Sequence, residues 1–318
     1  MPEADAENAH QPVLLQESLQ FLQPQHGNLF IDATLGLGGH SEAILNSSPD
    51  TRVIGIDQDK DALKFAQKRL SKFGKRVMII HANFSDIRKI VFEAKEGSPD
   101  GILADLGVSS LQFDSEKRGF SFRFDAPLDM RMDGESGGQT AAELLATTDQ
   151  DELANIIYKY GEERASRKIA RWIIEKRERG SPITTTFELA DLVKRAVRTS
   201  RKDKSHPATR TFQALRIAVN GELDILEQFI SDSIDLLNAK GVLAIITFHS
   251  LEDRIAKQAF QRFAGKCQCP PRIPQCVCGA AKKVEILTRK PVLPSEIEQR
   301  ENPRSRSAKL RACRKLEN

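Results

Sequence analysis

The sequence predicts a doubly wound α/β fold, in which helices cover both faces of a largely parallel sheet. Four short apolar segments, at residues 29–32, 52–57, 76–81 and 100–105, alternate with helical or turn patterns. The fourth segment is almost continuously apolar, as expected of a parallel strand that is buried on both faces. A glycine-rich turn directly follows the first segment, which is typical of the first βα unit of such folds.

Hydrophobic periodicity predicts the elements around these strands. Residues 10–22 and 59–73 carry apolar stripes of helical spacing, and Asp59 is a candidate cap for the second helix. A helical region at 140–199 precedes a fifth strand at 241–248 and a helix that ends near residue 263. Residues 283–288 are expected to form an edge strand, and the tail at 294–318 is polar and basic. We therefore expect an α/β domain built from residues 1–110 and 216–318, with a helical insertion at 111–215.

The turn at residues 32–40 has the composition of a ligand-binding turn. Its glycines at positions 36, 38 and 39 can adopt positive φ and let a ligand lie against the backbone. Asp57 ends the second strand about 20 residues further on, the spacing at which an acid reaches ribose hydroxyls. The alternative is a tight turn with a structural role only. Ser41 stands where a dinucleotide fingerprint needs its third glycine, which argues against a nicotinamide-dependent oxidoreductase.

The composition indicates a globular chain with a sizeable core. The 318 residues are 40% hydrophobic and 29% charged, which argues against global disorder. No apolar run reaches the roughly 18 residues that a membrane span needs. Residues 1–11 are acidic and polar, and they lack the basic and apolar regions of a signal peptide. We therefore expect a cytoplasmic protein without a membrane partner.

Positive charge is concentrated between residues 164 and 210. This segment contains 14 lysines and arginines against 5 acidic residues, a local net charge of +9. Because the formal net charge of the chain is +4, the remainder carries −5. A basic block in an otherwise acidic chain predicts a polyanion-binding face. The alternative is a set of solvated helix faces, the usual meaning of a charge run.

Aromatic residues provide candidates for contacts with bases. Residues 118–124 interleave arginine, glycine and phenylalanine, a mixture that can hold phosphates and stack on unpaired bases. Phe120 and Phe122 are candidates to hold an extruded base, and the alternative is an irregular loop with a few aromatics packed inside. Phe84, which follows the third strand, is interpreted either as packing near an adenine or as ordinary core.

Four of the five cysteines form two C-x-C pairs separated by prolines. Paired cysteines around a turn can bind zinc, but C-x-C is less usual than C-x₂-C and no histidine lies nearby. The alternative is a proline-stiffened loop with reduced thiols. Both interpretations stay open, and we assign no metal ligand; the four cysteines are Cys267, Cys269, Cys276 and Cys278.

The motifs taken together resemble one family. The pattern Asp32-x-x-x-Gly36-x-Gly38-Gly39 looks like the first motif of S-adenosylmethionine-dependent methyltransferases. The full set resembles the RsmH (MraW) family, the bacterial ribosomal RNA small-subunit (cytosine-N4)-methyltransferases. The resemblance runs from about residue 10 to residue 314 and rests on seven motifs in order, at residues 36–40, 105–110, 118–122, 127–133, 210–223, 248–254 and 301–307.

This resemblance implies a Rossmann-like S-adenosylmethionine-dependent methyltransferase with an inserted, mostly helical, RNA-recognition domain. It implies S-adenosyl-L-methionine as methyl donor and a decoding-centre cytosine of 16S rRNA in the small subunit as acceptor. We expect the protein to be a monomer or homodimer. Ala126 departs from the family, where glycine commonly precedes Pro-Leu-Asp-Met. By motif position the resemblance assigns cofactor contacts to Gly38, Gly39, His40, Asp57, Phe84, Asp105 and Gln112.

Asp105 is the candidate catalytic residue. It ends the fourth strand, where it can accept N–H bonds from the cytosine amino group or hold the methionine end of the cofactor. The wider amino-methyltransferase class often has a proline pair after this acid, but Leu106 and Gly107 follow it here, so that class's grip on the amino group cannot be copied. His249 is interpreted as structural. A rival hypothesis is a ribosome-assembly factor that binds RNA without catalysis.

Overall fold

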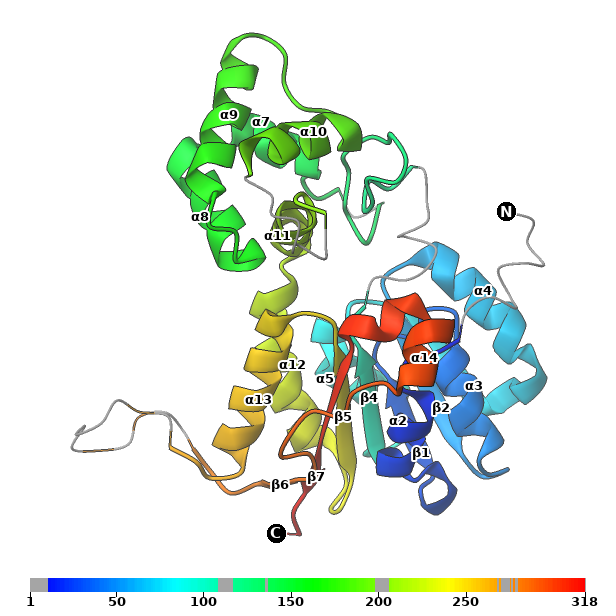
Figure 1. Ribbon diagram of the computed structural model, residues 1–318. Coiled ribbons are helices and arrows are strands. Elements are labelled where there is room, and N and C mark those ends of the chain that lie inside the picture. Colours follow the sequence, from blue (N-terminus) through cyan, green and yellow to red (C-terminus); the bar gives the residue numbers. More distant parts are fainter. Residues whose placement is uncertain are drawn as a thin grey trace. The chain divides into compact units, whose positions relative to one another are not determined.

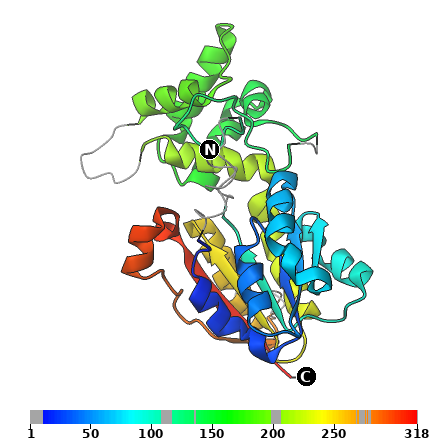
Figure 2. The ribbon, with the colours of Figure 1, turned by 90° about the vertical axis from the view of Figure 1, so that its right-hand side faces the viewer.

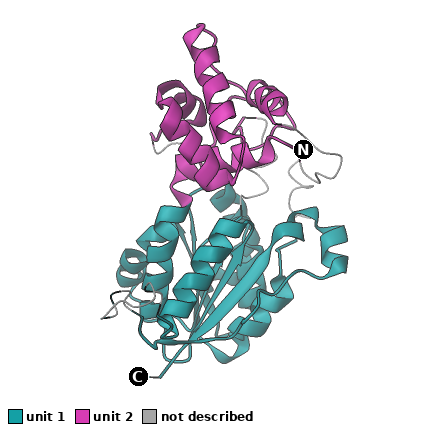
Figure 3. Ribbon diagram, turned by 60° about the vertical axis from the view of Figure 1, so that its left-hand side comes forward, with its two compact units in different colours: residues 1–107, 223–318 teal, residues 108–222 magenta. Residues whose placement is uncertain are grey.

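The computed structural model describes residues 11–107, 117–134, 137–197, 206–267, 269, 275, 277 and 280–317. The chain forms two compact units, which Figure 3 distinguishes by colour. Residues 1–107 and 223–318 form the first, here called the sheet unit, and residues 108–222 form the second, the helical unit. The divisions fall after residues 107 and 222, where the sequence predicted them after 110 and 215.

The sheet unit is built on one seven-stranded sheet in the order β3-β2-β1-β4-β5-β7-β6 (Figure 1). The first five strands are parallel, and β7 runs antiparallel to both of its neighbours. The predicted α/β class is therefore confirmed. The strands are β1 (Leu29–Asp32), β2 (Arg52–Asp57), β3 (Val77–His81), β4 (Gly101–Asp105), β5 (Val242–Thr247), β6 (Val284–Ile286) and β7 (Lys309–Lys315).

Helices bury both faces of this sheet (Figures 1 and 2). On β1, Phe30 joins the core on one face, and its neighbours Leu29 and Ile31 join the core on the other, because successive strand residues point in opposite directions. This double burial is why the strands contain apolar residues at almost every position. One face is covered by α5 (Ile87–Ala94), α12 (Glu222–Leu236) and α13 (Ser250–Phe263), and the other by α2 (Leu15–Leu22), α3 (Gly39–Asn46) and α4 (Lys60–Leu70).

Strand β7 was not predicted, because its sequence, KLRACRK, is too rich in charge to read as a buried strand. Within it, Arg311 is only 5% exposed, and a guanidinium group buried to this extent is unfavourable unless a carboxylate pairs with it. Asp253 of α13 neutralises it, with its Oδ1 2.6 Å from Arg311 Nε. The adjacent edge strand β6 has three residues, fewer than the predicted 283–288.

The helical unit is inserted between β4 and β5, as predicted. Its core combines apolar faces of its helices, and two of these begin with capping boxes at Thr140 and Thr185. No helix in the described part of the chain is both long and apolar enough to span a bilayer. The helices of this unit are α7 (Ala141–Thr147), α8 (Gln150–Gly161), α9 (Ser166–Glu178), α10 (Thr186–Ala196) and α11 (Thr209–Asn220).

Candidate functional site

Three aspartates gather at the carboxyl edge of the parallel sheet. Asp32, Asp57 and Asp105 are the last residues of β1, β2 and β4, and β1 lies between the other two strands. Burial raises the pKa of each carboxyl group to about 6. Open α/β sheets bind their ligands at this edge. The arrangement concentrates negative charge where the fold favours a ligand.

The glycine turn is tied to the acid that ends β2. Gly36 and Gly38 have φ of +51° and +79°, the left-handed region that glycine adopts without strain. The backbone N–H of Gly36 donates to Asp57 Oδ2 at 2.7 Å, and the N–H of Asp59 donates to Oδ1 at 2.8 Å. Each carboxylate oxygen keeps a further lone pair for a hydroxyl donor. Asp59 also caps α4 through its side chain, as predicted.

Gly39 is needed for packing inside the protein. A Cβ at this position would lie 2.5 Å from Cγ of Pro12. Hydrogen bonds fix the segment that contains Pro12 at two further points. His40 Nε2 donates to the Val13 carbonyl at 3.0 Å, and the Leu14 N–H donates to Glu298 Oε1 at 2.8 Å. Glu298 belongs to α14 (Glu296–Glu301), so this bond joins residues 11–14 to a helix near the carboxyl end of the sequence.

Asp32 accepts hydrogen bonds from residues of the turn itself and of the helix that follows it. Its side chain is 1% exposed, and its Oδ2 accepts from the Ser41 hydroxyl at 2.7 Å. Its Oδ1 accepts from the Thr34 N–H at 3.3 Å. Ser41, at the position of the third dinucleotide-fingerprint glycine, is thus itself part of the turn's hydrogen bonding.

Asp105 has an unused acceptor. Its Oδ1 is buried and accepts no hydrogen bond from the described part of the chain. Its Oδ2 lies 3.9 Å from Nδ1 of His40, whose ring is 7% exposed. Burial lowers the pKa of His40 and raises that of Asp105, while attraction between the two groups opposes both shifts. Such an orphaned acceptor indicates a place for an N–H or O–H donor from a ligand.

Thr34 links the turn to Asp105 and was missed from the sequence. Its hydroxyl oxygen accepts the backbone N–H of Asp105 at 2.6 Å, which fixes the end of β4 against the turn after β1. The sequence contained a signal, since Thr34 lies inside the turn motif between Asp32 and Gly36. The motif Asp32-x-x-x-Gly36-x-Gly38-Gly39 specifies only the acid and the glycines and leaves position 34 open.

The remaining predicted cofactor residues have different outcomes. Phe84 begins the short helix η3 (Phe84–Asp86) after β3, and its half-buried ring packs edge-on to Phe229 of α12, with centroids 4.9 Å apart. Phe84 therefore packs against the core while part of its side chain stays accessible. This place is compatible with both interpretations, packing near an adenine and ordinary core. Gln112 lies outside the described residues.

The segment after β5 forms the next part of the same edge. His249 caps α13, and Glu252 closes the capping box by accepting the His249 N–H at 3.3 Å, while it also accepts the Phe248 N–H at 2.8 Å. His249 therefore has the structural role that the sequence predicted. Glu252 is 2% exposed, and its charge adds to the raised pKa of Asp105. Phe248 packs so closely on Gly107 that a Cβ there would lie 2.8 Å from its ring.

The loop rich in phenylalanine is integral to the core of the helical unit. Phe120 is 7% exposed and belongs to that core, so its interpretation as a residue that holds a base is wrong. Phe122 packs against Phe212, with ring centroids 5.0 Å apart. Asn220 bonds the same loop, accepting from the Met132 N–H and donating to the Met130 carbonyl, both at 2.8 Å. These contacts show that residues 118–133 pack against the helices of the helical unit and are hydrogen-bonded to α11.

The cysteine loop is only partly described. Cys267 and Cys269 are described, and the Cys269 N–H donates to Cys267 Sγ at 3.4 Å. Cys276 and Cys278 lie outside the described residues. Both interpretations of the four cysteines, a zinc site and a loop with reduced thiols, therefore stay predictions.

A family model described as the MraW methylase family matches residues 7–316. The chain belongs to this family. A Ribosomal RNA small subunit methyltransferase H from Carboxydothermus hydrogenoformans is 48% identical and aligns over 98% of this chain and 99% of its own. One from Symbiobacterium thermophilum is 50% identical, over 97% of both chains. A solved rRNA methylase from Streptococcus thermophilus is 13% identical, covers 97% of this chain and 100% of its own, and has a TM-score of 0.41.

Membership of the MraW methylase family confirms the resemblance carried by the seven motifs. Together with the sheet order, it confirms the predicted fold, a Rossmann-like α/β methyltransferase with an inserted helical unit.

Proposed function

We propose that this protein transfers a methyl group from S-adenosyl-L-methionine to the N4 amino group of a decoding-centre cytosine in 16S rRNA. The single observation that carries the proposal is the buried, unpartnered Oδ1 of Asp105 at the carboxyl end of β4. Asp105 is a residue of a chain in the MraW methylase family, and two relatives of this chain are named as ribosomal RNA small subunit methyltransferases.

The residues at the sheet edge fit the proposed cofactor. S-adenosylmethionine carries a positive sulfonium and a positive ammonium group, and the three aspartates are largely ionised at neutral pH, since their pKa values are about 6. Asp57 keeps lone pairs for the ribose hydroxyls, and Phe84 offers an apolar ring at the end of the next strand. Gly38 and Gly39 lie where the turn that follows β1 enters α3.

The cofactor supplies an activated methyl group, so the protein needs mainly to position the acceptor nitrogen in line with it. The N4 lone pair of cytosine is delocalised into the ring and is a poor nucleophile. Asp105 accepts an N–H bond from this nitrogen through Oδ1, which favours a more pyramidal and nucleophilic amine. The alternative role, in which Asp105 binds the cofactor's ammonium group, uses the same oxygen. The pair His40 and Asp105 is buried, which strengthens either interaction.

The helical unit supplies candidate contacts to rRNA. Its basic block is partly used in ion pairs, such as Arg171 with Glu175 at 3.6 Å and Lys176 with Glu188 at 3.4 Å. Arg164, Arg167 and Arg179 are exposed. Exposed arginines suit phosphate contacts, and the target base must leave its stack to reach a buried carboxylate.

Methyl transfer to purified small subunits tests the proposal. Subunits from cells that lack this protein are incubated with the enzyme and isotope-labelled S-adenosylmethionine, and the rRNA is then digested and mapped by mass spectrometry. We expect one labelled N4-methylcytosine in the decoding centre. Label in another nucleotide would overturn the assignment of N4, and RNA binding without any label would favour the assembly-factor hypothesis.

A further inference from the structure

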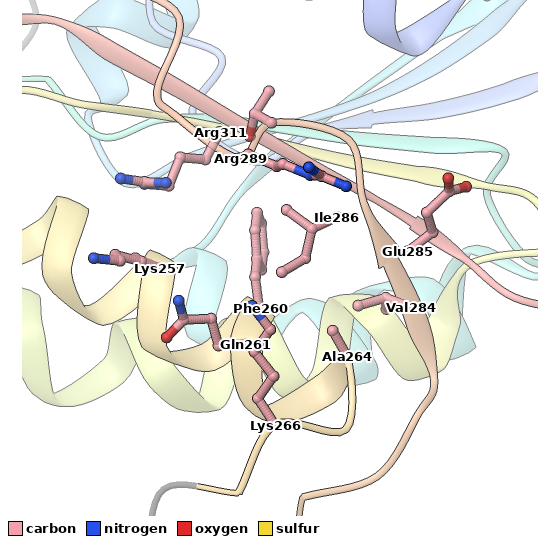
Figure 4. A pocket seen from close by; sticks show the side chains of 11 residues that line it. Lys257, Phe260, Gln261, Ala264, Lys266, Val284, Glu285, Ile286, Arg289 and Arg311 are labelled. Carbon is pink, nitrogen blue, oxygen red and sulfur yellow. The ribbon is translucent and has the colours of Figure 1, made fainter.

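A second concave site lies on the sheet unit, between α13 and the antiparallel strands. Its cavity has a volume of about 510 Å³. Figure 4 shows Phe260 and Ile286 at its centre, with Lys257 and Gln261 on the side of α13 and Arg289 and Arg311 on the opposite side. Strands β6 and β7 stand at the edge of the sheet beyond β5, whereas the aspartates end β1, β2 and β4. The groove is therefore distinct from the candidate methyl-transfer site.

Positive charge in this groove exceeds the acid available to neutralise it. Four cationic side chains line the cavity, against one carboxylate, that of Glu285. Arg311 is paired with Asp253, and Glu285 is 3.6 Å from Arg314. This pairing leaves three exposed cations that form no ion pair with the described part of the chain: Lys257, Lys266 and Arg289.

The uncharged lining offers little for reading bases. Phe260 and Val284 are 1% and 2% exposed, so neither ring face nor methyl group protrudes to stack on a base. The Thr288 hydroxyl is already bonded, since it accepts the Ala312 N–H at 3.0 Å. Gln261 is the one uncharged polar side chain of the lining left for a ligand. Three cations without base-reading partners suit phosphates, whose contacts position RNA without specifying its sequence.

We infer that this groove, defined by Lys257, Lys266 and Arg289, binds the phosphodiester backbone of single-stranded RNA. The inference rests on the proposed rRNA substrate. A second basic site on the sheet unit lets the enzyme hold the strand at a point other than the one where the base is methylated. Because the contacts are electrostatic, binding is independent of base sequence and weakens with salt.

The test compares two triple variants that remove the same charge. The groove variant is Lys257→Gln with Lys266→Gln and Arg289→Gln. The control variant is Lys75→Gln with Lys89→Gln and Lys95→Gln, which alters exposed lysines away from β6 and β7. The affinity for a fluorescein-labelled oligouridine is measured by anisotropy over a range of KCl concentrations. Each lost contact to single-stranded RNA lowers the salt slope by about 0.7, so we expect a decrease of about 2 in the groove variant.

An unchanged slope in the groove variant, or an equal decrease in the control variant, would overturn the inference. Displacement of the oligouridine by inorganic phosphate beyond the effect of KCl at equal ionic strength would also overturn it, in favour of a site for free anions. Circular dichroism checks that both variants fold. Oligouridine binding does not depend on methyl transfer, so failure of the labelling experiment with the natural protein would remove the proposed function without affecting this measurement.

Discussion

His40 faces Asp105 with the one ring nitrogen that carries no proton. Its Nε2 lies 3.0 Å from the carbonyl oxygen of Val13, which can only accept, so Nε2 is the donor. In the neutral ring, Nδ1 then presents a lone pair 3.9 Å from Oδ2 of Asp105. Neither group of the pair can supply a proton to the other when Asp105 is ionised. The site is thus built to accept hydrogen bonds from a ligand.

Replacement of Asp105 should separate activity from stability. Asp105→Asn removes the charged acceptor, so we expect methyl transfer to fall by about 100-fold or more. Because burial raises the folded-state pKa of Asp105 from 3.8 to about 6, its ionisation opposes folding at pH 7 by at most about 3 kcal/mol. The variant should therefore unfold at a higher urea concentration than the natural protein at pH 7.

The stability gain of Asp105→Asn should depend on pH in a defined direction. Above pH 6 the folded protein bears the full cost of the ionised carboxylate, and this cost disappears as the pH falls from about 6 towards 4. Urea unfolding at pH 7 and at pH 4.5 measures the difference. A gain that is equal at both pH values would contradict the burial argument.

Cofactor affinity should weaken in mild acid. The carboxyl group of Asp105 has a pKa of about 6, and its protonation removes the charge that attracts the cofactor's ammonium group. We expect the affinity for S-adenosylhomocysteine, which retains this group, to fall by about tenfold per pH unit below 6. Isothermal titration calorimetry between pH 5 and pH 8 measures it. An affinity that is constant over this range would show that the ionised Asp105 does not bind the ligand.

Removal of His40 should move this pH dependence. Once it is protonated in mild acid, the His40 ring attracts the Asp105 carboxylate and lowers its pKa, so His40→Asn should raise that pKa and shift the midpoint of cofactor binding to higher pH. The same titration in the variant gives the midpoint. A weaker affinity at every pH with an unchanged midpoint would mean that His40 acts only through its bond to Val13.

Gly39 should tolerate no side chain. In Gly39→Ala the new methyl group would meet Pro12 at 2.5 Å, and overpacking of this kind costs about 1–3 kcal/mol. Gly134→Ala is the matched control, because no atom lies within 4 Å of a Cβ at that position. Thermal unfolding of both variants measures the difference. Equal unfolding temperatures would show that residues 11–14 do not pack on the turn as described.

Asn220 should hold the loop at 118–133 in the helical unit. Asn220→Ala leaves the Met132 N–H and the Met130 carbonyl without a partner, so we expect a loss of about 3 kcal/mol in the free energy of unfolding. Asn155→Ala, on the exposed side of α8, is the control and should change little. Equal stability of the two variants would show that these bonds contribute nothing.

Sequence patterns of short range predicted much of the fold. The strands that end in Asp32, Asp57 and Asp105 are apolar on both faces, so their composition alone identifies them. The cap signal at Asp59 and the helical stripes were predicted for the same reason, because each depends on residues within a few positions. The seven motifs then identified the family.

Features that depend on distant partners could not be predicted. Strand β7 reads as a polar tail until Asp253, 58 residues away, neutralises Arg311. Phe120 reads as a base-stacking residue until the helical unit encloses it. The sequence by itself determined the order of the five parallel strands, the family and the acids at the sheet edge. Only the tertiary structure decided which polar atoms are satisfied, such as Asp57 by Gly36, and which are not, such as Oδ1 of Asp105, because hydrogen bonding and burial arise between segments far apart in the chain.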